Sequence, residues 1–579
     1  MKSKKLLVII LLIAAFLRFW KLSDIPVSLF GDELDVGYHA YSILNTGKDY
    51  YGNTLPLHFH SLAEWRTPLY LYSVVPTVAI WGISALGVRV PAAIFGVLGV
   101  YAFYLLVNEL FPNKKLKLGS LRFSLGEIAA FFLAISPWHI QYSRAAFEVT
   151  QLVLFMLLGL YFFFRSLKDG KYLWLSVLFF VLTPWVYSTA KLFTPLLMIF
   201  IFVVWKKDII SIKKAHLKKA VIAGLIVGLP IAVSTIFGGG AQRFSYVNIF
   251  SDPTIEPEVG VDRLHDARFR GEEGTGLSPT LPDRVLHNKF TFWGEKLSDN
   301  FFDTLSFSFL FNNGDPNLRH SIEGMGQLYR VEIVALLLGL IFFFSGRANK
   351  KLKWLIVFWI LAGIIPSVIT RNGGTHATRL ILILPPLMLL ISYGLVEGLG
   401  RLKGKLPILL TGGYVLLLGF NFINYQHNFW VHNPWYSERW WHYGWKQAIN
   451  SIKEVEGSYD RVFLSMTGEP AWIFFAGTYE YPSSEWQTNF PVGNDTFVEG
   501  FGGISFIDKY YFGSPDEEGS AGIFDLRKFI TNKDLYLANA SEVPENLIMY
   551  PNKSPVGLKL IKSIPFPSGE PAFYLFSGE

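Results

Sequence analysis

The sequence contains no cysteine and few charged residues. Among its 579 residues, Asp, Glu, Lys and Arg make up 17%, whereas about a quarter is usual in soluble domains. Without cysteine, disulfides, thiolate metal sites and cysteine nucleophiles are all excluded. The low charge, a hydrophobic fraction of 51% and a mean hydropathy of +0.33 together indicate an integral membrane protein.

Apolar runs are frequent along the chain. A helix that crosses about 30 Å of hydrocarbon needs about 20 residues, and fewer where the surroundings are polar. Candidate spans lie near residues 6–20, 90–111, 125–140, 148–164, 172–188, 192–205, 220–237, 331–345, 353–369, 379–399 and 406–423. The sequence therefore predicts about eleven transmembrane helices.

The basic residues decide the topology. The first apolar run follows Lys2, Lys4 and Lys5 and lacks a small-residue cleavage site, so we expect an uncleaved anchor with a cytoplasmic amino terminus. Residues 68–83 could form a twelfth span or a helix on the membrane surface. If they do not cross, the basic loops near 114–122, 165–171, 206–219, 347–353 and 401–405 are all cytoplasmic. The positive-inside rule favours this arrangement, and it explains the pI of about 9.1 without nucleic-acid binding.

This threading leaves three large pieces on the outer face: residues 22–89, 238–329 and 424–579. In the last piece, helix-like residues 445–455 precede strand-like residues 461–465, which is typical of a small α/β domain. We therefore predict a polytopic α-helical protein, multi-pass in the plasma membrane. A transmembrane domain should cover residues 1–423, with juxtamembrane helices in its first outer loop, and an extracytoplasmic α/β domain should cover residues 424–579.

An acidic cluster opens the first outer loop. Asp32, Glu33 and Asp35 follow the first span by about ten residues. Carboxylates at a membrane surface can act as a general base or hold a divalent cation. The alternative is a solvated acidic turn or a helix cap.

Acids and bases from four other segments should meet the same face. Ionisable side chains near the membrane are costly to bury, so their positions are informative, although Arg and Lys also reach outward from span ends for purely physical reasons. The residues are Glu64, Arg66, Arg144, Glu148, Lys191, Arg371, His376 and Arg379. Carboxylates beside several cations suit a reaction in which an acceptor is activated while a departing phosphate is stabilised.

The order of these features resembles a known family. One span, an outer Asp-Glu, a basic residue shortly before Pro-Leu-Tyr, and the phrases GVRVPAAIFGVLGVYAFYLLVNELF, SPWHIQYSRAAFE and HATRLILILPPLMLLISYGL resemble the C-type membrane glycosyltransferases. The chain is most similar to the branch of dolichyl-phosphate-mannose protein mannosyltransferases and the lipid A aminoarabinose transferase. The resemblance covers residues 1–200 best and implies the C-type glycosyltransferase fold.

The resemblance also implies roles for individual residues. Asp32 corresponds to the catalytic carboxylate, Glu33 to its acidic neighbour and Arg66 to a basic phosphate contact. Glu148 corresponds to an acid that is usually aspartate in the relatives. The aminoarabinose transferase has an arginine where this chain has Asp35.

The implied activity is transfer of a hexose or pentose from a polyprenyl-phosphate donor to a protein, lipid or glycan acceptor on the outer face. Asp32 would act as the general base, with inversion at the anomeric carbon. Arg66, Lys191, Arg371 and Arg379 would bind the donor phosphate. A divalent cation on Asp32 and Glu148 is a candidate cofactor, and the alternative is that the Arg and Lys cations suffice.

Two further stretches invite a functional interpretation. In the loop 238–329, Asp315, Arg319, His320, Gln327 and Tyr329 could roof the site, where Arg319, His320 and Tyr329 would bind substrate together with Glu64, Arg144 and His376. The alternative is loop scaffolding with Gly and Pro turns.

The sequence WWHYG at residues 440–444 resembles the WWDYG signature of oligosaccharyltransferases, with histidine in place of aspartate. An aromatic belt at the membrane interface is the alternative explanation of these tryptophans. Two alternative functions therefore compete with transfer of a single sugar. One is that of an oligosaccharyltransferase, and the other, from a different class, is that of a lipid or sugar transporter or flippase.

Overall fold

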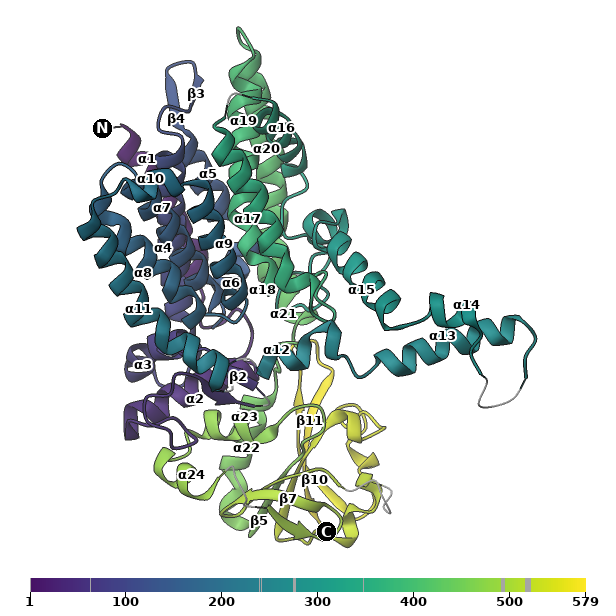
Figure 1. Cartoon of the computed structure of the whole chain (residues 1–579). Coiled ribbons are helices and arrows are strands. Elements are labelled where there is room, and N and C mark those ends of the chain that lie inside the picture. Colours follow the sequence, from purple (N-terminus) through teal and green to yellow (C-terminus); the bar gives the residue numbers. More distant parts are fainter. Residues whose placement is uncertain are drawn as a thin grey trace.

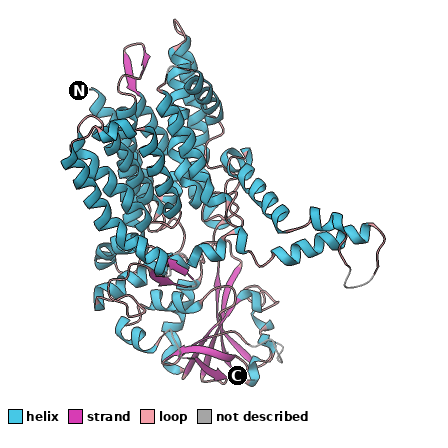
Figure 2. Ribbon diagram, viewed as in Figure 1, coloured by secondary structure: helices cyan, strands magenta, loops and turns pink. Residues whose placement is uncertain are grey.

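A long helical bundle stands on a smaller part that contains a β-sheet (Figure 1). The computed structural model describes residues 2–62, 64–238, 240, 242–273, 278–346, 348–490, 495–515 and 522–579. Figure 2 shows that strands gather in the carboxyl-terminal part, apart from two short hairpins.

Every predicted apolar run contains a helix. The bundle comprises α1 (Lys2–Phe19), α4 (Ala85–Leu110), α5 (Leu125–Ile135), α6 (Pro137–Tyr142), α7 (Val149–Ser166), α8 (Leu173–Leu182), α9 (Ala190–Val204), α11 (Lys214–Phe237), α16 (Glu332–Ser345), α17 (Lys350–Val368), α18 (Ala377–Leu380), α19 (Leu384–Gly400) and α20 (Leu406–His427). Among the described residues, six helical stretches are long and apolar enough to cross a membrane. They are residues 85–110, 149–166, 214–237, 350–368, 377–400 and 406–436. The chain is thus built to span a membrane several times, and the number eleven stays a prediction.

The two ends of the bundle differ. At one end lie the amino terminus, the hairpin of β3 (Lys115–Leu118) and β4 (Leu121–Ser124), and α10 (Lys206–Ile210). At the other end lie α2 (Gly31–Thr46), α3 (Pro68–Trp81) and the hairpin of β1 (Phe59–Ser61) and β2 (Glu64–Arg66). The basic loops predicted to be cytoplasmic and the acidic cluster therefore belong to opposite ends.

The segment between α11 and α16 forms a lateral arm (Figure 1). It contains α12 (Gln242–Val247), α13 (Ile255–Phe269), α14 (Leu281–Leu286) and α15 (Lys289–Thr304). The segment from residue 305 to 331, which contains a π-helix at Ser308–Asn312, then returns to the base of the bundle, where Arg319 contacts Phe30 at the start of α2.

A seven-stranded mixed sheet organises the carboxyl-terminal part. Its strands are β5 (Arg461–Leu464), β6 (Asp495–Val498), β7 (Gly502–Ile507), β8 (Tyr510–Phe512), β9 (Asp534–Asn539), β10 (Leu558–Pro565) and β11 (Pro571–Gly578), in the order β10-β11-β9-β5-β8-β7-β6. The central strand β5 runs parallel to β8 and β9, and the other pairs are antiparallel. The helices of this part are α21 (Asn433–Tyr436), α22 (Trp445–Val455), α23 (Ala471–Tyr479) and α24 (Ser483–Asn489).

The first outer loop and the sheet part share one hydrophobic core. Leu34, Tyr38 and Tyr50 are buried in the same cluster as Ile449 and Phe474. Gln487 adds hydrogen bonds from α24 to the side chains of Ser42 and Thr46 in α2. Because apolar area is buried jointly, α2 and residues 445–575 stabilise each other. The division into domains at residue 424 stays a prediction.

Helices α16 and α19 are in backbone contact. A Cβ atom at Gly394 would lie 2.0 Å from the Ala335 carbonyl oxygen, so this position accepts only glycine unless the helices separate. Small residues allow such close approach within a membrane, where packing takes the place of the hydrophobic effect between helices.

We predict that Gly394→Val lowers the free energy of unfolding by about 3 kcal/mol, the upper end of typical overpacking costs. The measurement is thermal unfolding of the purified protein in detergent. Gly412→Val is the matched control, because a Cβ atom at Gly412 meets no atom within 4 Å. Equal melting temperatures of the two variants would contradict the close contact.

Candidate functional site

The amino-terminal turn of α2 presents Asp32. Phe30 precedes the helix in an extended conformation, and Asp32 and Glu33 occupy its first turn, where the helix dipole favours negative charge. Asp32 Oδ1 lies 2.6 Å from Arg66 Nη2 in β2; the Asp32 side chain is 43% exposed and that of Arg66 8%. The predicted base is therefore reachable from solvent while its partner is held inside the protein.

A second aspartate, Asp35, also contacts Arg66. Its carboxylate is buried, accepts hydrogen bonds from Tyr50 (2.6 Å) and Ser61 (2.5 Å), and lies 3.8 Å from Arg66 Nε. Burial raises the pKa of Asp35 and lowers the pKa of the neighbouring His39 to about 3. His39 is thus a neutral imidazole at pH 7 and adds no positive charge beside Arg66.

Glu33 points away from Asp32 into a buried ion pair. Arg89 of α4 binds both carboxylate oxygens, at 2.8 and 2.7 Å, and the Ala146 N–H donates to Glu33 Oε1 at 2.9 Å. Arg89 also donates to the carbonyl oxygens of Pro26 (2.8 Å) and Ser28 (2.5 Å). These bonds fix the start of α2 against α4 and the loop before α7.

Glu148 lies at the end of that loop, as the residue that precedes α7. Glu148 and Glu33 both lie within electrostatic range of Tyr70. Glu33 and Glu148, which come from distant segments, therefore act on the same tyrosine.

Asp315, His320 and His376 form a compact cluster. One ligand atom of each lies within 4.8 Å of the others, and no other group of three His, Asp or Glu side chains in the described chain is arranged in this way. Asp315 accepts hydrogen bonds from the Asn317 and Ala377 N–H groups, both at 2.9 Å. The predicted metal ligands Asp32 and Glu148 are not members of this cluster.

The cluster borders Asp32. His320 lies within electrostatic range of Asp32, and burial lowers the pKa of His320 to about 3. The Arg319 guanidinium lies 5.0 Å from the centre of the Phe30 ring, at the start of α2. Arg319 of the returning loop therefore lies against the start of α2, and the roof over the site stays a prediction.

A largely apolar groove opens near the cluster. It has a volume of about 290 Å³ and is lined by residues of α9, α11, α12 and α17 together with Lys191 and Arg379. Lys191 Nζ donates to His58 Nε2 (3.1 Å) and to the Gly240 carbonyl oxygen (2.8 Å). Arg379 donates to Thr370 Oγ1 at 2.6 Å, and its charge reaches Asp315. The groove thus carries two cations in its lining, and one of them, Arg379, acts on Asp315.

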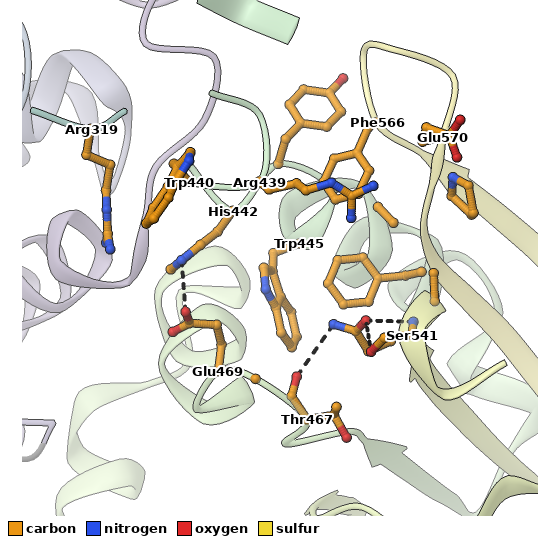
Figure 3. A pocket seen from close by; sticks show the side chains of 17 residues that line it. Arg319, Arg439, Trp440, His442, Trp445, Thr467, Glu469, Ser541, Phe566 and Glu570 are labelled. Atoms are coloured by element: carbon orange, nitrogen blue, oxygen red, sulfur yellow. Dashed lines mark hydrogen bonds and ion pairs between the residues drawn. The ribbon is translucent and has the colours of Figure 1, made fainter. Parts of the chain in front are cut away.

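A second cleft, of about 660 Å³, lies between Arg319 of the returning loop and the carboxyl-terminal part (Figure 3). Arg319, Arg439, Trp440 and Trp445 line it. His442 accepts a hydrogen bond from the Gly31 N–H at 3.4 Å through Nδ1 and lies 3.0 Å from Glu469 through Nε2. The segment 440–444 therefore touches the residue next to Asp32, which the aromatic-belt interpretation does not require.

Other predicted residues have structural contacts. Arg144 donates to the carbonyl oxygens of Leu17, Lys21 and Ile25, Arg371 pairs with Asp252 at 3.1 Å, and Tyr329 donates to the Ile135 carbonyl at 2.7 Å. Their roles in binding stay predictions. Glu64 belongs to β2, and its side chain lies outside the described part of the structure.

Arg89 and His58 were not among the site residues predicted from the sequence. Arg89 stands inside the apolar stretch GVRVP, and a charge at such a position signals a buried partner. His58 carries no comparable signal, because its contact with Lys191 joins segments 133 residues apart.

Comparisons with known proteins agree with the family resemblance. No family model matches the chain. Over 164 residues, which are 27% of this chain and 21% of the relative, it is 27% identical to a Bacillus subtilis protein described as "Putative mannosyltransferase YkcB". The chain resembles membrane glycosyltransferases. The resemblance predicted from the sequence motifs is thus confirmed over the matched residues.

Two solved structures illustrate the similarity. ArnT from Cupriavidus metallidurans is 10% identical, with a TM-score of 0.49 over 99% of this chain and 98% of ArnT. The Archaeoglobus fulgidus oligosaccharyltransferase is 15% identical, with a TM-score of 0.48 over 82% of this chain. The matched part spans 61% of that enzyme and about a fifth of the Bacillus relative.

We predict that Arg89→Met lowers the free energy of unfolding by about 3–5 kcal/mol, because it leaves the Glu33 carboxylate buried without its counter-ion. Thermal unfolding in detergent measures the effect. Arg122→Met is the matched control, since Arg122 is exposed in β4, and it should melt like the parent. A loss below about 1 kcal/mol in Arg89→Met would show that this pair does not hold the site together.

Proposed function

We propose that the protein transfers one sugar from a polyprenyl-phosphate donor to an acceptor, with Asp32 as the general base and inversion at the anomeric carbon. The observation that carries the proposal is a partly exposed carboxylate, paired with Arg66 at 2.6 Å, together with an apolar groove lined by Lys191 and Arg379. Asp32 and Arg379 both lie within electrostatic range of His320. A lipid-linked sugar phosphate needs this combination of an apolar channel, cations and a base.

Side chains of this protein can supply the proton acceptor and the cations that the transfer reaction needs. The acceptor hydroxyl gives its proton to Asp32, and its oxygen forms a bond to the anomeric carbon from the face opposite the phosphate. The bond between that carbon and the phosphate oxygen breaks, and the electron pair leaves with the phosphate. Lys191 and Arg379 stabilise the released charge, and Arg66 orients the carboxylate. Glu33 then has a positioning role through its ion pair with Arg89. Glu148 is the second acid of the proposed site, in addition to the base Asp32.

The proposed topology has eleven spans, a cytoplasmic amino terminus and an extracytoplasmic carboxyl-terminal part. The opposite placement of the basic loops and of Asp32 supports it, because basic loops are retained on the cytoplasmic side. In this arrangement α3 lies on the membrane surface and the transferred sugar leaves on the outer face.

An oligosaccharyltransferase is the second candidate, and the contact of His442 with Gly31 beside Asp32 favours it. Purified enzyme that transfers an oligosaccharide block to Asn-containing peptides, and no single sugars, would select this function. A transporter or flippase would instead move substrate across proteoliposomes without transferring sugar. Single-sugar transfer from a short polyprenyl-phosphate donor selects the proposed function.

We predict that Asp32→Asn folds and inserts but loses transfer by at least about 100-fold, because a general base typically contributes 10²–10⁴-fold. The assay measures the transfer of sugar from a short polyprenyl-phosphate donor to the acceptor that the parent protein uses. Asp24→Asn, an exposed aspartate before α2, should keep parental activity. Activity of Asp32→Asn within about threefold of the parent would remove Asp32 from the mechanism.

We predict that Lys191→Met lowers kcat/KM for the donor by about tenfold or more, since a hydrogen bond to a charged group contributes roughly 1.5–3 kcal/mol. Inhibition by free polyprenyl phosphate should weaken to a similar extent, which reports binding separately from chemistry. Lys218→Met, which is exposed at the far end of α11, is the control. Unchanged inhibition in Lys191→Met would place the phosphate elsewhere.

A further inference from the structure

The cluster of Asp315, His320 and His376 has the donor set of a metal site. Two imidazoles and a carboxylate with ligand atoms within 4.8 Å of one another match the three protein ligands of catalytic zinc sites, which leave a further position open. Donor atoms about 2.0 Å from a zinc ion lie about 3.3 Å apart, so small side-chain rotations bring these three into range.

The surroundings hold the ligands as a metal site requires. His320 Nδ1 lies 3.3 Å from Thr378 Oγ1, which leaves Nε2 for a ligand, and Thr378 Oγ1 is in turn 2.7 Å from the Tyr142 hydroxyl. The His320 ring stacks on Tyr142 with an interplanar angle of 11°. Hydrogen bonds to the second imidazole nitrogen and rigid packing orient metal-bound histidines in this way.

The third ligand comes from a constrained turn. His376 follows the sequence RNGG at residues 371–374, and a Cβ atom at Gly373 would lie 1.9 Å from the Ser367 carbonyl oxygen. The turn therefore requires glycine, and it brings His376 to a ring-centre distance of 5.3 Å from His320. Asp315 is tied to the same turn, because its Oδ2 accepts the Ala377 N–H.

We propose that Asp315, His320 and His376 bind one divalent transition-metal ion, of which Zn²⁺ is the first to test. Imidazole donors select this class over Mg²⁺ and Ca²⁺, which prefer oxygen ligands. The charges of Arg319 and Arg379 oppose a cation, and the carboxylates of Asp315 and Asp32 offset them.

The charged groups around the cluster define what a bound ion would do in the proposed reaction. Asp32 and Arg379 both lie within electrostatic range of His320, so a bound ion would add charge stabilisation for a donor phosphate held by Arg379. This task rests on the proposed function, whereas metal binding itself does not.

The test uses the full chain in detergent, purified through a tag without histidines and stripped with a chelator. Zn²⁺ is added, and bound metal per chain is measured by elemental analysis after gel filtration. Co²⁺ then serves as a spectroscopic probe, since its visible absorption reports the nitrogen and oxygen donors. We expect one ion per chain, and at least a 100-fold weaker affinity in His320→Gln and His376→Gln, because even outer-shell changes cost 10–100-fold.

A rival pair needs a control. His427 is the exposed last residue of α20, His432 is half-buried in the π-helical turn that follows, and their Nε2 atoms lie 3.1 Å apart. The double variant His427→Gln/His432→Gln should keep the one bound ion and the cobalt spectrum. Asp315→Asn is an additional ligand variant, and melting of each metal-free variant like the metal-free parent confirms that it is folded.

Parental protein that binds no more zinc than His320→Gln, or binding that disappears only in the His427/His432 double variant, would overturn the proposal. Failure of the metal site is distinguishable from failure of the proposed function. Asp32→Asn should still bind one ion while transfer is lost. A parent that transfers sugar without binding any ion would leave the function intact and reject the site.

Discussion

The buried ion pair of Glu33 and Arg89 is the constraint on which the site depends. Arg89 joins α4 to α2 and to the turn before it, Glu33 adds the loop before α7 through Ala146, and the Arg89 guanidinium also lies 5.7 Å from the Trp441 ring. Four chain segments thus meet at one pair. Because a buried charge without its partner is costly, these segments cannot separate independently, and Asp32 is positioned as the neighbour of Glu33.

The carboxyl-terminal part takes part in this arrangement. It shares a hydrophobic core with α2 and lines the larger cleft together with Arg319 of the returning loop. His442 in that cleft contacts Gly31, the neighbour of Asp32. The apolar groove with Lys191 and Arg379 shares no lining residue with the cleft.

Much of the fold follows from sequence patterns, as particular elements show. Each apolar run contains a helix, because burial in lipid requires internally satisfied backbone groups. Residues 68–81 form α3 at the same end of the bundle as α2, and its placement on the membrane surface stays a prediction. The resemblance also pointed to Asp32 and Arg66, which the structure brings to 2.6 Å. The partner of Glu33 was not foreseen, since sequence spacing says nothing about which charges pair across 56 residues.

The sequence by itself determined the membrane-spanning helices, their expected orientation and the gathering of acids and bases at one end, because hydrophobic length and charge are local properties of the chain. Only the tertiary structure decided which of these side chains face one another. It turned Glu33 into a buried anchor, placed His442 beside Asp32 and united Asp315, His320 and His376 from two distant loops. Such contacts depend on the packing of helices and loops that no local pattern encodes.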